Sequence, residues 1–271
     1  MSDSKHLYDD GFYKAQMDKS YISAKEMLGY LNTLLPNPKS VIDVGCGVGT
    51  WLKAWSEINE DMQVFGIDGN DVSKGLYQIS LDFYQRVDLT QNYMILMDSL
   101  TANTGGGGKP FTLAQSLEVA EHLYEQHALN FIKLLTSLSD IVLFSAAIPL
   151  QGGTHHVNEQ PPAYWADLFA QCDFLCFDIL REPLWENKNI ESYYRQNAFL
   201  FIHRENTGFL YEKGFKPTSK PLHIVSPDLF EPYTLAYNYY LSHCTHLQSK
   251  LDKRLSARFR KALRKIRNML K

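Results

Sequence analysis

The sequence has few cysteines and no long apolar stretch. Its four cysteines are irregularly spaced among 271 residues, which excludes a disulfide framework and a cysteine-based zinc site. The longest unbroken apolar runs, Tyr93–Met97 and Ala198–Ile202, have five residues and are too short to cross a bilayer. The first twenty residues lack the apolar core of a secretion signal. We therefore expect a reduced, cytoplasmic protein.

The net charge is only −3, but the charge is unevenly distributed. Residues 250–271 contain ten Lys or Arg and one acid, Asp252, whereas the other residues include 17 basic and 29 acidic side chains. An acidic body does not suit a protein that follows nucleic-acid phosphates, so a nucleic-acid partner is not expected.

The basic segment also has a regular apolar pattern. Apolar residues recur at helical spacing, at Leu251, Leu255, Phe259, Ala262, Ile266 and Leu270. This pattern predicts a basic amphipathic helix over 250–271, able to lie on an anionic membrane surface. Docking on a partner protein or on the acidic body is an equal alternative at this point.

Short β-rich runs alternate with helical patterns through the middle of the chain. The predicted strands are 41–44, 62–67, 84–87, 111–117, 140–147, 175–180 and 197–203, and the predicted helices between them are 50–58, 119–137 and 161–171. This alternation predicts an α/β fold with a Rossmann-like, doubly wound, mostly parallel seven-stranded sheet. Ahead of it, Ser23 to Glu26 is typical of a capping box, starting a helix that Pro36 and Pro38 end.

A glycine-rich turn follows the first predicted strand, in Asp43-Val44-Gly45-Cys46-Gly47-Val48-Gly49. Glycines at alternate positions let the backbone turn tightly and approach a ligand closely. A dinucleotide-binding G-x-G-x-x-G would need a third glycine where Thr50 stands. The acid before the turn suits a cationic ligand better than a pyrophosphate. Asp68 and Asp88 end the next two predicted strands. The alternative is a tight turn capped by Asp43, with Asp68 and Asp88 as solvated loop acids.

Taken together, these residues resemble the cofactor motif of class I S-adenosylmethionine-dependent methyltransferases, over roughly residues 20–205. The resemblance implies a set of cofactor contacts: Asp43, Gly45, Gly47, Gly49, Asp68, Asp88, Leu89 and Gln16. In it, Asp68 would accept ribose hydroxyls and Asp88 the adenine amino group. It also divides the chain into an N-terminal helical cap (1–38), a methyltransferase domain (39–205), a C-terminal extension (206–249) and the basic helix (250–271).

A second cluster follows the fourth predicted strand, in Glu118-Val119-Ala120-Glu121-His122. If the helix begins near Glu118, residues at i, i+3 and i+4 share one face, so Glu118, Glu121 and His122 converge. Two carboxylates and an imidazole, without a thiolate, suit Mg²⁺, Mn²⁺ or Fe²⁺. The alternative is a capping Glu118, a solvated Glu121 and a packed His122.

This E-x-x-E-H pattern resembles the metal motif of methyltransferases that act on the terminal ribose 2′-hydroxyl of small RNAs, and of those in ubiquinone biosynthesis. The RNA enzymes add a histidine from the loop after the fifth strand, which corresponds to His156. A metal that holds the acceptor would lower the pKa of its hydroxyl, and a neutral histidine would take the proton. His155 is the candidate base, so the predicted catalytic residues are His155 and His156.

The stretches 118–123, 144–149, 153–160 and 193–197 are similar to bacterial methyltransferases encoded with capsule, O-antigen and other surface-glycan pathways. This chain departs from them in an insertion at 91–110 and in the basic tail. The resemblance implies O-methylation of a sugar hydroxyl on a nucleotide-sugar or surface-glycan intermediate, at the inner face of the membrane.

The predicted acceptor-binding residues are Trp185, Tyr193, Tyr194 and Arg195, with Arg195 holding a phosphate. Core packing is an equal alternative for the aromatic side chains. Two rival functions are an RNA 2′-O-methyltransferase with the same metal chemistry and a non-catalytic scaffold that keeps the fold.

Overall fold

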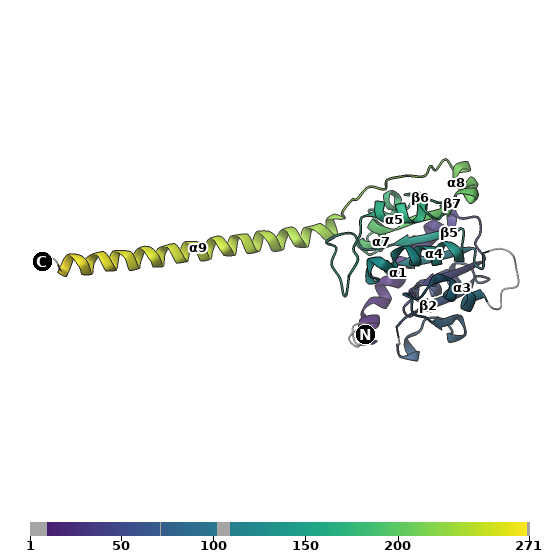
Figure 1. The fold of residues 1–271 in the computed structure, drawn as a ribbon, viewed down its shortest axis with the longest axis horizontal. Coiled ribbons are helices and arrows are strands. Elements are labelled where there is room, and N and C mark those ends of the chain that lie inside the picture. The colour runs from purple at the N-terminus through teal and green to yellow at the C-terminus, as the bar shows by residue number, and fades with distance from the viewer. Residues whose placement is uncertain (1–9, 71, 102–108, 270–271) are drawn as a thin grey trace. The chain divides into compact units, whose positions relative to one another are not determined.

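The computed structural model describes residues 10–70, 72–101 and 109–269 (Figure 1). Contacts within the chain divide it into two units, Met1–Ile224 and Val225–Lys271, which are described separately.

A single sheet of seven strands forms the centre of the first unit, in the order β3-β2-β1-β4-β5-β7-β6. The strands are β1 Ser40–Val44, β2 Gln63–Asp68, β3 Tyr84–Arg86, β4 Leu113–Leu117, β5 Ile141–Ser145, β6 Phe174–Phe177 and β7 Phe199–His203. The pairs from β3 to β5 are parallel, and β7 runs antiparallel to both of its neighbours. The predicted mostly parallel, doubly wound fold is confirmed.

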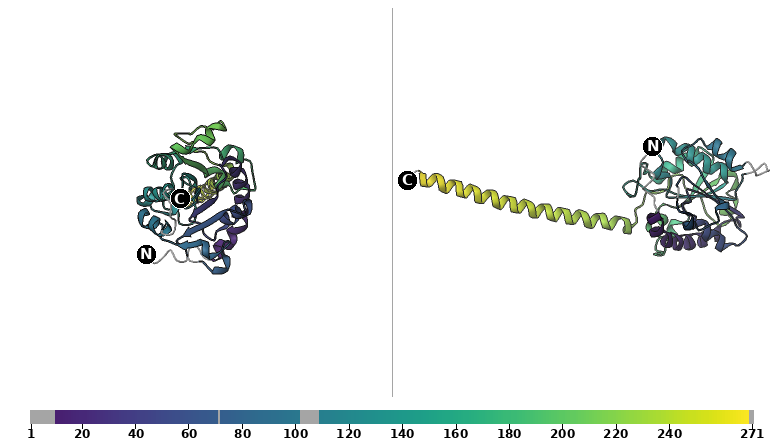
Figure 2. Two further views of the ribbon diagram at one scale, coloured as in Figure 1. Left: turned by 90° about the vertical axis from the view of Figure 1, so that its right-hand side faces the viewer. Right: turned by 90° about the horizontal axis from the view of Figure 1, so that it is seen from below.

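Helices connect the strands and cover both faces of the sheet (Figure 2). The α-helices are α1 Asp10–Leu34, α2 Thr50–Ile58, α3 Tyr93–Thr101, α4 Ala128–Leu138, α5 Pro162–Ala170, α6 Arg181–Leu184, α7 Ser192–Asn197, α8 Gly208–Glu212 and α9 Pro227–Met269. Short 3₁₀ turns lie at η2 Lys74–Leu76, η3 Leu81–Phe83, η4 Ala120–His122, η5 Glu125–His127 and η6 Arg204–Asn206.

Two hydrophobic cores flank the sheet. One contains the buried sides of α1 and α2, and the other those of α3, α4 and α5. In β5, Ile141 and Leu143 belong to the first core, whereas Val142 and Phe144 belong to the second. Because both faces are covered, the central strands are apolar on both sides. Buried polar side chains occur at the strand ends, as with Asp68 and Ser145, and also inside β4, at Gln115 and Ser116.

The helix α2 has the predicted bounds and faces the first core with Trp51, Leu52 and Trp55. The indole Nε1 of Trp55 donates a hydrogen bond of 2.8 Å to Gln115 Oε1 in β4. This buried bond fixes α2 against the sheet, so that its first turn stands beside the carboxyl end of β1.

The N-terminal helix differs from the prediction. It ends at Leu34, before Pro36, as expected, but it begins at Asp10, so Ser23 lies inside it and the predicted capping box is wrong. The Ser23 hydroxyl instead donates to the Lys19 carbonyl at 2.8 Å and accepts from the Glu191 amide at 2.9 Å. It joins α1 to the segment before α7.

The insertion at 91–110 contains a helix, α3, that the sequence pattern did not predict. Its apolar side chains pack on α4 in the second core, because Leu96 is buried there and Met97 and Leu100 lie against it. The insertion therefore extends the covering of the sheet.

The second unit is built on one long helix, α9, of 43 residues. The basic segment from 250 to 269 is its C-terminal part, so the predicted amphipathic helix continues toward the N-terminus. Among the helices in the described ranges, none is both long enough and apolar enough to cross a membrane.

The buried Ser23 hydroxyl gives a stability prediction. Replacing Ser23 by Ala leaves the Glu191 amide without its partner, and an unsatisfied buried donor costs about 1–3 kcal/mol. Urea denaturation should show this loss for Ser23→Ala. The control is Thr33→Ala in the same helix, where an exposed hydroxyl bonds only to the Tyr30 carbonyl. Equal effects of the two changes would contradict the role given to Ser23.

Candidate active site

A cavity of about 1040 Å³ lies at the carboxyl ends of β1 to β4, where parallel α/β sheets bind their ligands. It brings together most of the predicted site residues: Gln16, Asp43, Gly45, Gly47, Asp68, Asp88, Leu89, Glu118, Glu121, His122, His155, His156, Tyr193 and Tyr194. Three predicted residues are not part of its lining, namely Gly49, Trp185 and Arg195.

The glycine turn is tied to the end of β2. The amides of Gly45 and Cys46 both donate to the Ile67 carbonyl, at 2.8 and 3.1 Å, and the Gly47 amide donates to Asp68 Oδ2 at 2.8 Å. Gly45 has φ +86°, and a Cβ there would collide with the side chain of Val119. The turn therefore requires glycine at position 45 for both its conformation and its packing.

Gly49 has a structural role. It caps α2 in a left-handed conformation, and a Cβ at this position would press on Ile79. The predicted contact between Gly49 and a cofactor stays a prediction.

Asp43 and Asp68 are buried acids at the bottom of the turn. Burial raises the pKa of Asp43 to about 7, with the Asp68 charge adding to the rise and Gln115 opposing it. Burial also raises the pKa of Asp68, against the backbone amides that donate to it, which include Asn70 at 2.7 Å. Two buried acids side by side are stabilised when a cation binds near them.

Asp88 lies two residues after β3, exposed in the cavity lining, and its Oδ1 accepts from the amide and hydroxyl of Thr90 at 2.9 and 2.6 Å. Leu89 beside it is buried. Among the described lining residues, five are carboxylates and one is a guanidinium, Arg86. The charge of the lining therefore favours a cationic ligand.

The residues after β4 do not form the predicted helix. Glu118 has φ +56°, residues Ala120–His122 form the 3₁₀ turn η4, and α4 begins only at Ala128. The Glu118 amide donates to the backbone and the hydroxyl of Ser145 in β5, which holds the chain in this strained conformation. The predicted helical face for Glu118, Glu121 and His122 is therefore wrong.

Three of the four predicted metal ligands nevertheless meet. Candidate ligand atoms of Glu121, His122 and His156 all lie within 4.8 Å of one another. Glu118 is outside this group, because its carboxylate accepts from Gln151 Nε2 at 2.9 Å and from Asn197 Nδ2 at 3.1 Å.

Glu121 is the most unusual residue of the cluster. Its side chain is 0% exposed, and neither carboxylate oxygen accepts a well-directed hydrogen bond, although the nearby backbone amides of Glu121 and Ala147 act to lower its pKa. Burial raises the pKa of Glu121 well above its ordinary value, and the nearby Glu118 charge adds to this. A buried carboxylate without donors is costly, whereas a bound cation would satisfy it. The donor set of one carboxylate and two imidazoles fits a divalent transition metal such as Fe²⁺ or Mn²⁺ better than Mg²⁺, which prefers oxygen ligands.

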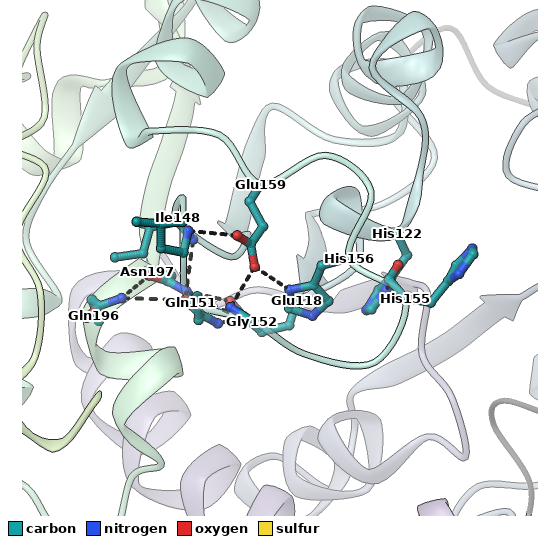
Figure 3. Close-up of polar contacts among 11 residues, drawn as sticks. Glu118, His122, Ile148, Gln151, Gly152, His155, His156, Glu159, Gln196 and Asn197 are labelled. Carbon is teal, nitrogen blue, oxygen red and sulfur yellow. Dashed lines mark hydrogen bonds and ion pairs between the residues drawn. The ribbon is translucent and has the colours of Figure 1, made fainter. Parts of the chain in front are cut away.

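The two histidines have well-defined ring orientations (Figure 3). His122 Nδ1 lies 3.2 Å from the His155 carbonyl, so this nitrogen is the donor. Burial lowers the pKa of His122 to about 4, which leaves the ring neutral at physiological pH. His156 Nδ1 lies 2.9 Å from Glu159 Oε1, which leaves Nε2 for another ligand. A Cβ at Gly153 would collide with that Nε2.

Glu159 organises the loop after β5, a role that sequence reasoning missed. Besides His156, its carboxylate accepts from the amides of Leu150 and Gly152, at 2.8 and 2.7 Å (Figure 3). A carboxylate that fixes a histidine in this way is typical of metal sites, where it sets the tautomer of the ligand. The only sequence signal was an acid three residues after a histidine.

The aromatic wall of the cavity comes from α2 and α7. Tyr194 packs edge-on against Trp51, with ring centroids 4.9 Å apart, and Tyr193 packs on Tyr194. The Ser20 hydroxyl accepts from Trp51 Nε1 at 3.1 Å and lies 3.4 Å from the Tyr194 hydroxyl. Burial raises the pKa of Tyr194 to about 12, so this phenol remains neutral. Trp51 and Ser20 were not predicted.

Arg195 and Trp185 support the wall from behind. Arg195 is buried, and its guanidinium donates to the carbonyls of Ile190 and Trp185. This corrects the prediction that Arg195 holds a substrate phosphate. Trp185 is likewise outside the cavity lining, so the predicted contact between its side chain and the acceptor is not supported.

No family model and no curated protein matches this sequence. Three solved structures illustrate its remote structural likenesses. A candidate O-methyltransferase from Nostoc punctiforme PCC 73102 has a TM-score of 0.48 at 11% identity, over 70% of this chain and 58% of that one. An O-methyltransferase family protein from Burkholderia thailandensis has a TM-score of 0.47 at 12% identity, over 73% and 60%.

Magnesium protoporphyrin IX methyltransferase from Synechocystis PCC 6803, with bound S-adenosylmethionine, has a TM-score of 0.47 at 18% identity, over 73% of this chain and 88% of that one. The chain spans less than two thirds of the Nostoc and Burkholderia proteins. All three scores lie below 0.5, so function has to be inferred from the cavity itself.

The buried Glu121 gives a prediction for the metal-free protein. Its pKa is raised on folding, so its contribution to stability is complete below the ordinary value near 4.5 and is lost as the pH rises through the folded value. In chelator, the free energy of unfolding should fall between pH 5 and pH 8 in the unchanged protein, and it should fall less in Glu121→Gln. The difference between the two proteins should be about 1.4 kcal/mol for each pH unit by which the pKa of Glu121 is raised within this range.

Denaturant titration at several pH values measures this difference. The control is Glu125→Gln, an exposed acid in η5, which should behave like the unchanged protein. If Glu121→Gln and the unchanged protein lose stability in parallel as the pH rises, the carboxylate is not the buried, unpaired group that the structure shows.

Proposed function

We propose that the chain is an S-adenosylmethionine-dependent O-methyltransferase that uses a divalent metal ion and acts on a sugar hydroxyl of a nucleotide-sugar or surface-glycan intermediate. One observation carries the proposal: a single cavity joins the acidic glycine turn to the Glu121, His122 and His156 cluster. A methyl donor and a metal-held acceptor would then face each other inside one site.

The donor half of the cavity is the glycine turn with Asp43, Asp68 and Asp88. S-adenosylmethionine carries a sulfonium and an ammonium, and the acids offer these charges a complementary surface. Asp43, whose pKa is raised to about 7, would ionise fully beside a cation. Asp68, which accepts from the amides of Gly47 and Asn70 at the carboxyl end of β2, would accept the ribose hydroxyls, as the resemblance implies.

In the acceptor half, Glu121, His122 and His156 would hold the metal. A bound divalent ion would lower the pKa of a coordinated sugar hydroxyl and fix its position. Glu159 sets the orientation of His156, and the His155 carbonyl sets that of His122. His155 is exposed in the cavity lining. We assign it the role of the base that removes the proton from the acceptor hydroxyl.

Methyl transfer from a sulfonium is an in-line displacement, so positioning is a large part of catalysis. The rigid wall of Trp51, Tyr193 and Tyr194 would limit where the acceptor can lie. A volume of about 1040 Å³ exceeds what one small ligand needs and leaves room for donor and acceptor together. The sugar acceptor itself rests on the resemblance to surface-glycan methyltransferases.

The test is methyl transfer by the full chain. The protein is incubated with isotope-labelled S-adenosylmethionine and a panel of nucleotide-sugars, in Mn²⁺ or Mg²⁺ or in chelator, and the products are analysed by mass spectrometry. We expect one class of nucleotide-sugar to gain the label. Chelator or Glu121→Gln should lower the rate roughly a hundredfold, because either removes the group that activates the acceptor. Glu125→Gln should have little effect.

Each alternative gives a different result. Labelling of the 3′-terminal ribose of a small RNA, with the sugars unlabelled, would favour the RNA enzyme. An absence of S-adenosylmethionine binding in calorimetry would favour a non-catalytic scaffold. Transfer that continues unchanged in chelator and in Glu121→Gln would remove the metal from the mechanism.

Glu159 gives a prediction about metal affinity alone. Glu159→Gln keeps the size of the side chain but removes the charge that orients His156, and loss of such a partner typically weakens metal binding about 10–100-fold. Titration with Mn²⁺, followed by electron paramagnetic resonance, measures this without turnover. Glu125→Gln is the control and should bind normally. Unchanged affinity in Glu159→Gln would show that His156 needs no carboxylate partner.

A further inference from the structure

The helix α9 carries a continuous apolar face. From residue 247 onward this face consists of Leu247, Leu251, Leu255, Phe259, Leu263 and Ile266, which we call the apolar stripe. These side chains are 50–66% exposed, and none of the residues of α9 is buried. At about 100° per residue, they fall within one half of the helix surface. Tyr237 and Tyr240 continue the stripe toward the N-terminus.

Positive charge runs along the edge of the stripe. Arg254, Arg258, Lys261 and Lys265 follow one another at spacings of four, three and four, which places them in a row beside it. Six further Lys or Arg lie within residues 250–271, against the single acid Asp252. The partner of this helix therefore has to match an apolar face and a dense positive charge together.

A second copy of α9 matches poorly. Parallel pairing would bring the two basic rows against each other at the positions that flank a helix–helix seam. Antiparallel pairing would place the basic half against residues 227–249, whose only charged side chains are the acids Asp228 and Glu231. Two acids do not balance a surplus of nine positive charges.

The other candidates satisfy only one half of the requirement. A nucleic acid would neutralise the charge but leave the stripe in water, and Phe259 is the only aromatic residue within 250–271 for base stacking. The first unit is acidic, but its exposed large apolar side chains in the described ranges are scattered over several elements, as with Leu81, Leu150 and Tyr211. An anionic lipid surface satisfies both halves, because acyl chains accept the stripe and headgroups accept the basic row.

We propose that α9 binds an anionic membrane surface, with the apolar stripe in the acyl-chain boundary and the basic row at the headgroups. The tyrosines at 237 and 240 suit the same boundary, where aromatic rings with a polar end are enriched. The helix lies along the surface and does not span the membrane. This proposal is independent of the methyl-transfer chemistry.

The experiment is co-sedimentation of the full chain with vesicles of phosphatidylcholine alone or with one third phosphatidylglycerol. We expect binding to the anionic vesicles to be at least tenfold tighter and to weaken in 0.5 M salt. The double variant Leu255→Gln with Phe259→Gln should lower this binding at least tenfold, because it removes apolar area from the stripe.

The matched control uses Leu235 and Tyr239, which have the same spacing on the opposite face of α9 and are 69% and 64% exposed. Leu235→Gln with Tyr239→Gln should bind vesicles like the unchanged protein. Circular dichroism shows whether either variant loses helix. A third variant, with Arg258, Lys261 and Lys265 changed to Gln, should lose the preference for anionic lipid.

Three outcomes would overturn the proposal. The first is vesicle binding that does not depend on lipid charge or on the stripe. The second is a stripe-dependent dimer in light scattering without vesicle binding, which would assign the stripe to a second copy. The third is tight, salt-sensitive binding of RNA without vesicle binding, which would assign the basic row to nucleic acid.

Discussion

The candidate site is organised around a carboxylate that the protein buries without a well-directed hydrogen bond to its oxygens. Candidate ligand atoms of Glu121, His122 and His156 lie within 4.8 Å of one another, and the Glu121 side chain is inaccessible to water. Folding removes water from this carboxylate, and the backbone amides of Glu121 and Ala147, which lower its pKa, offset that cost only in part, so its burial lowers the stability of the metal-free protein. Such a group persists where a ligand compensates for it, and the neutral His122 and the oriented His156 complete a donor set of that kind.

The neighbouring acid, Glu118, shows the opposite arrangement. Its carboxylate accepts from the amides of Gln151 and Asn197, which come from the loop after β5 and from α7. Two glutamates three residues apart thus differ in their surroundings: one is satisfied by the protein and holds three segments together, and the other remains open to a ligand. The strained backbone of Glu118 is part of this arrangement, since a helical conformation there would move both side chains.

Much of the fold followed from the sequence, because apolar runs and glycine turns act locally. The strands and α2 were predicted for that reason. Asp43, Asp68 and Asp88 were expected at one site because the carboxyl ends of parallel strands lie at the same edge of a sheet. The failures have different causes. Ser23 was misassigned because its partner, the Glu191 amide, is distant in sequence. Arg195 was misassigned because the sequence pattern does not show that its side chain is buried and turns back to the carbonyls of Ile190 and Trp185. The metal cluster was predicted from a helical face, whereas a 3₁₀ turn and the loop after β5 assemble it.

Hydrogen bonds to Glu159 and Glu121 fix both ends of the loop from Leu150 to Glu159. The Glu159 carboxylate accepts from the amides of Leu150 and Gly152. The Glu121 carbonyl accepts from the amides of Val157 and Asn158, at 2.9 and 3.0 Å. Between these anchors, residues 153–155 are exposed. The ligand geometry is therefore preorganised: an incoming ion would meet a loop whose conformational entropy was already lost during folding, and would bind without an ordering penalty.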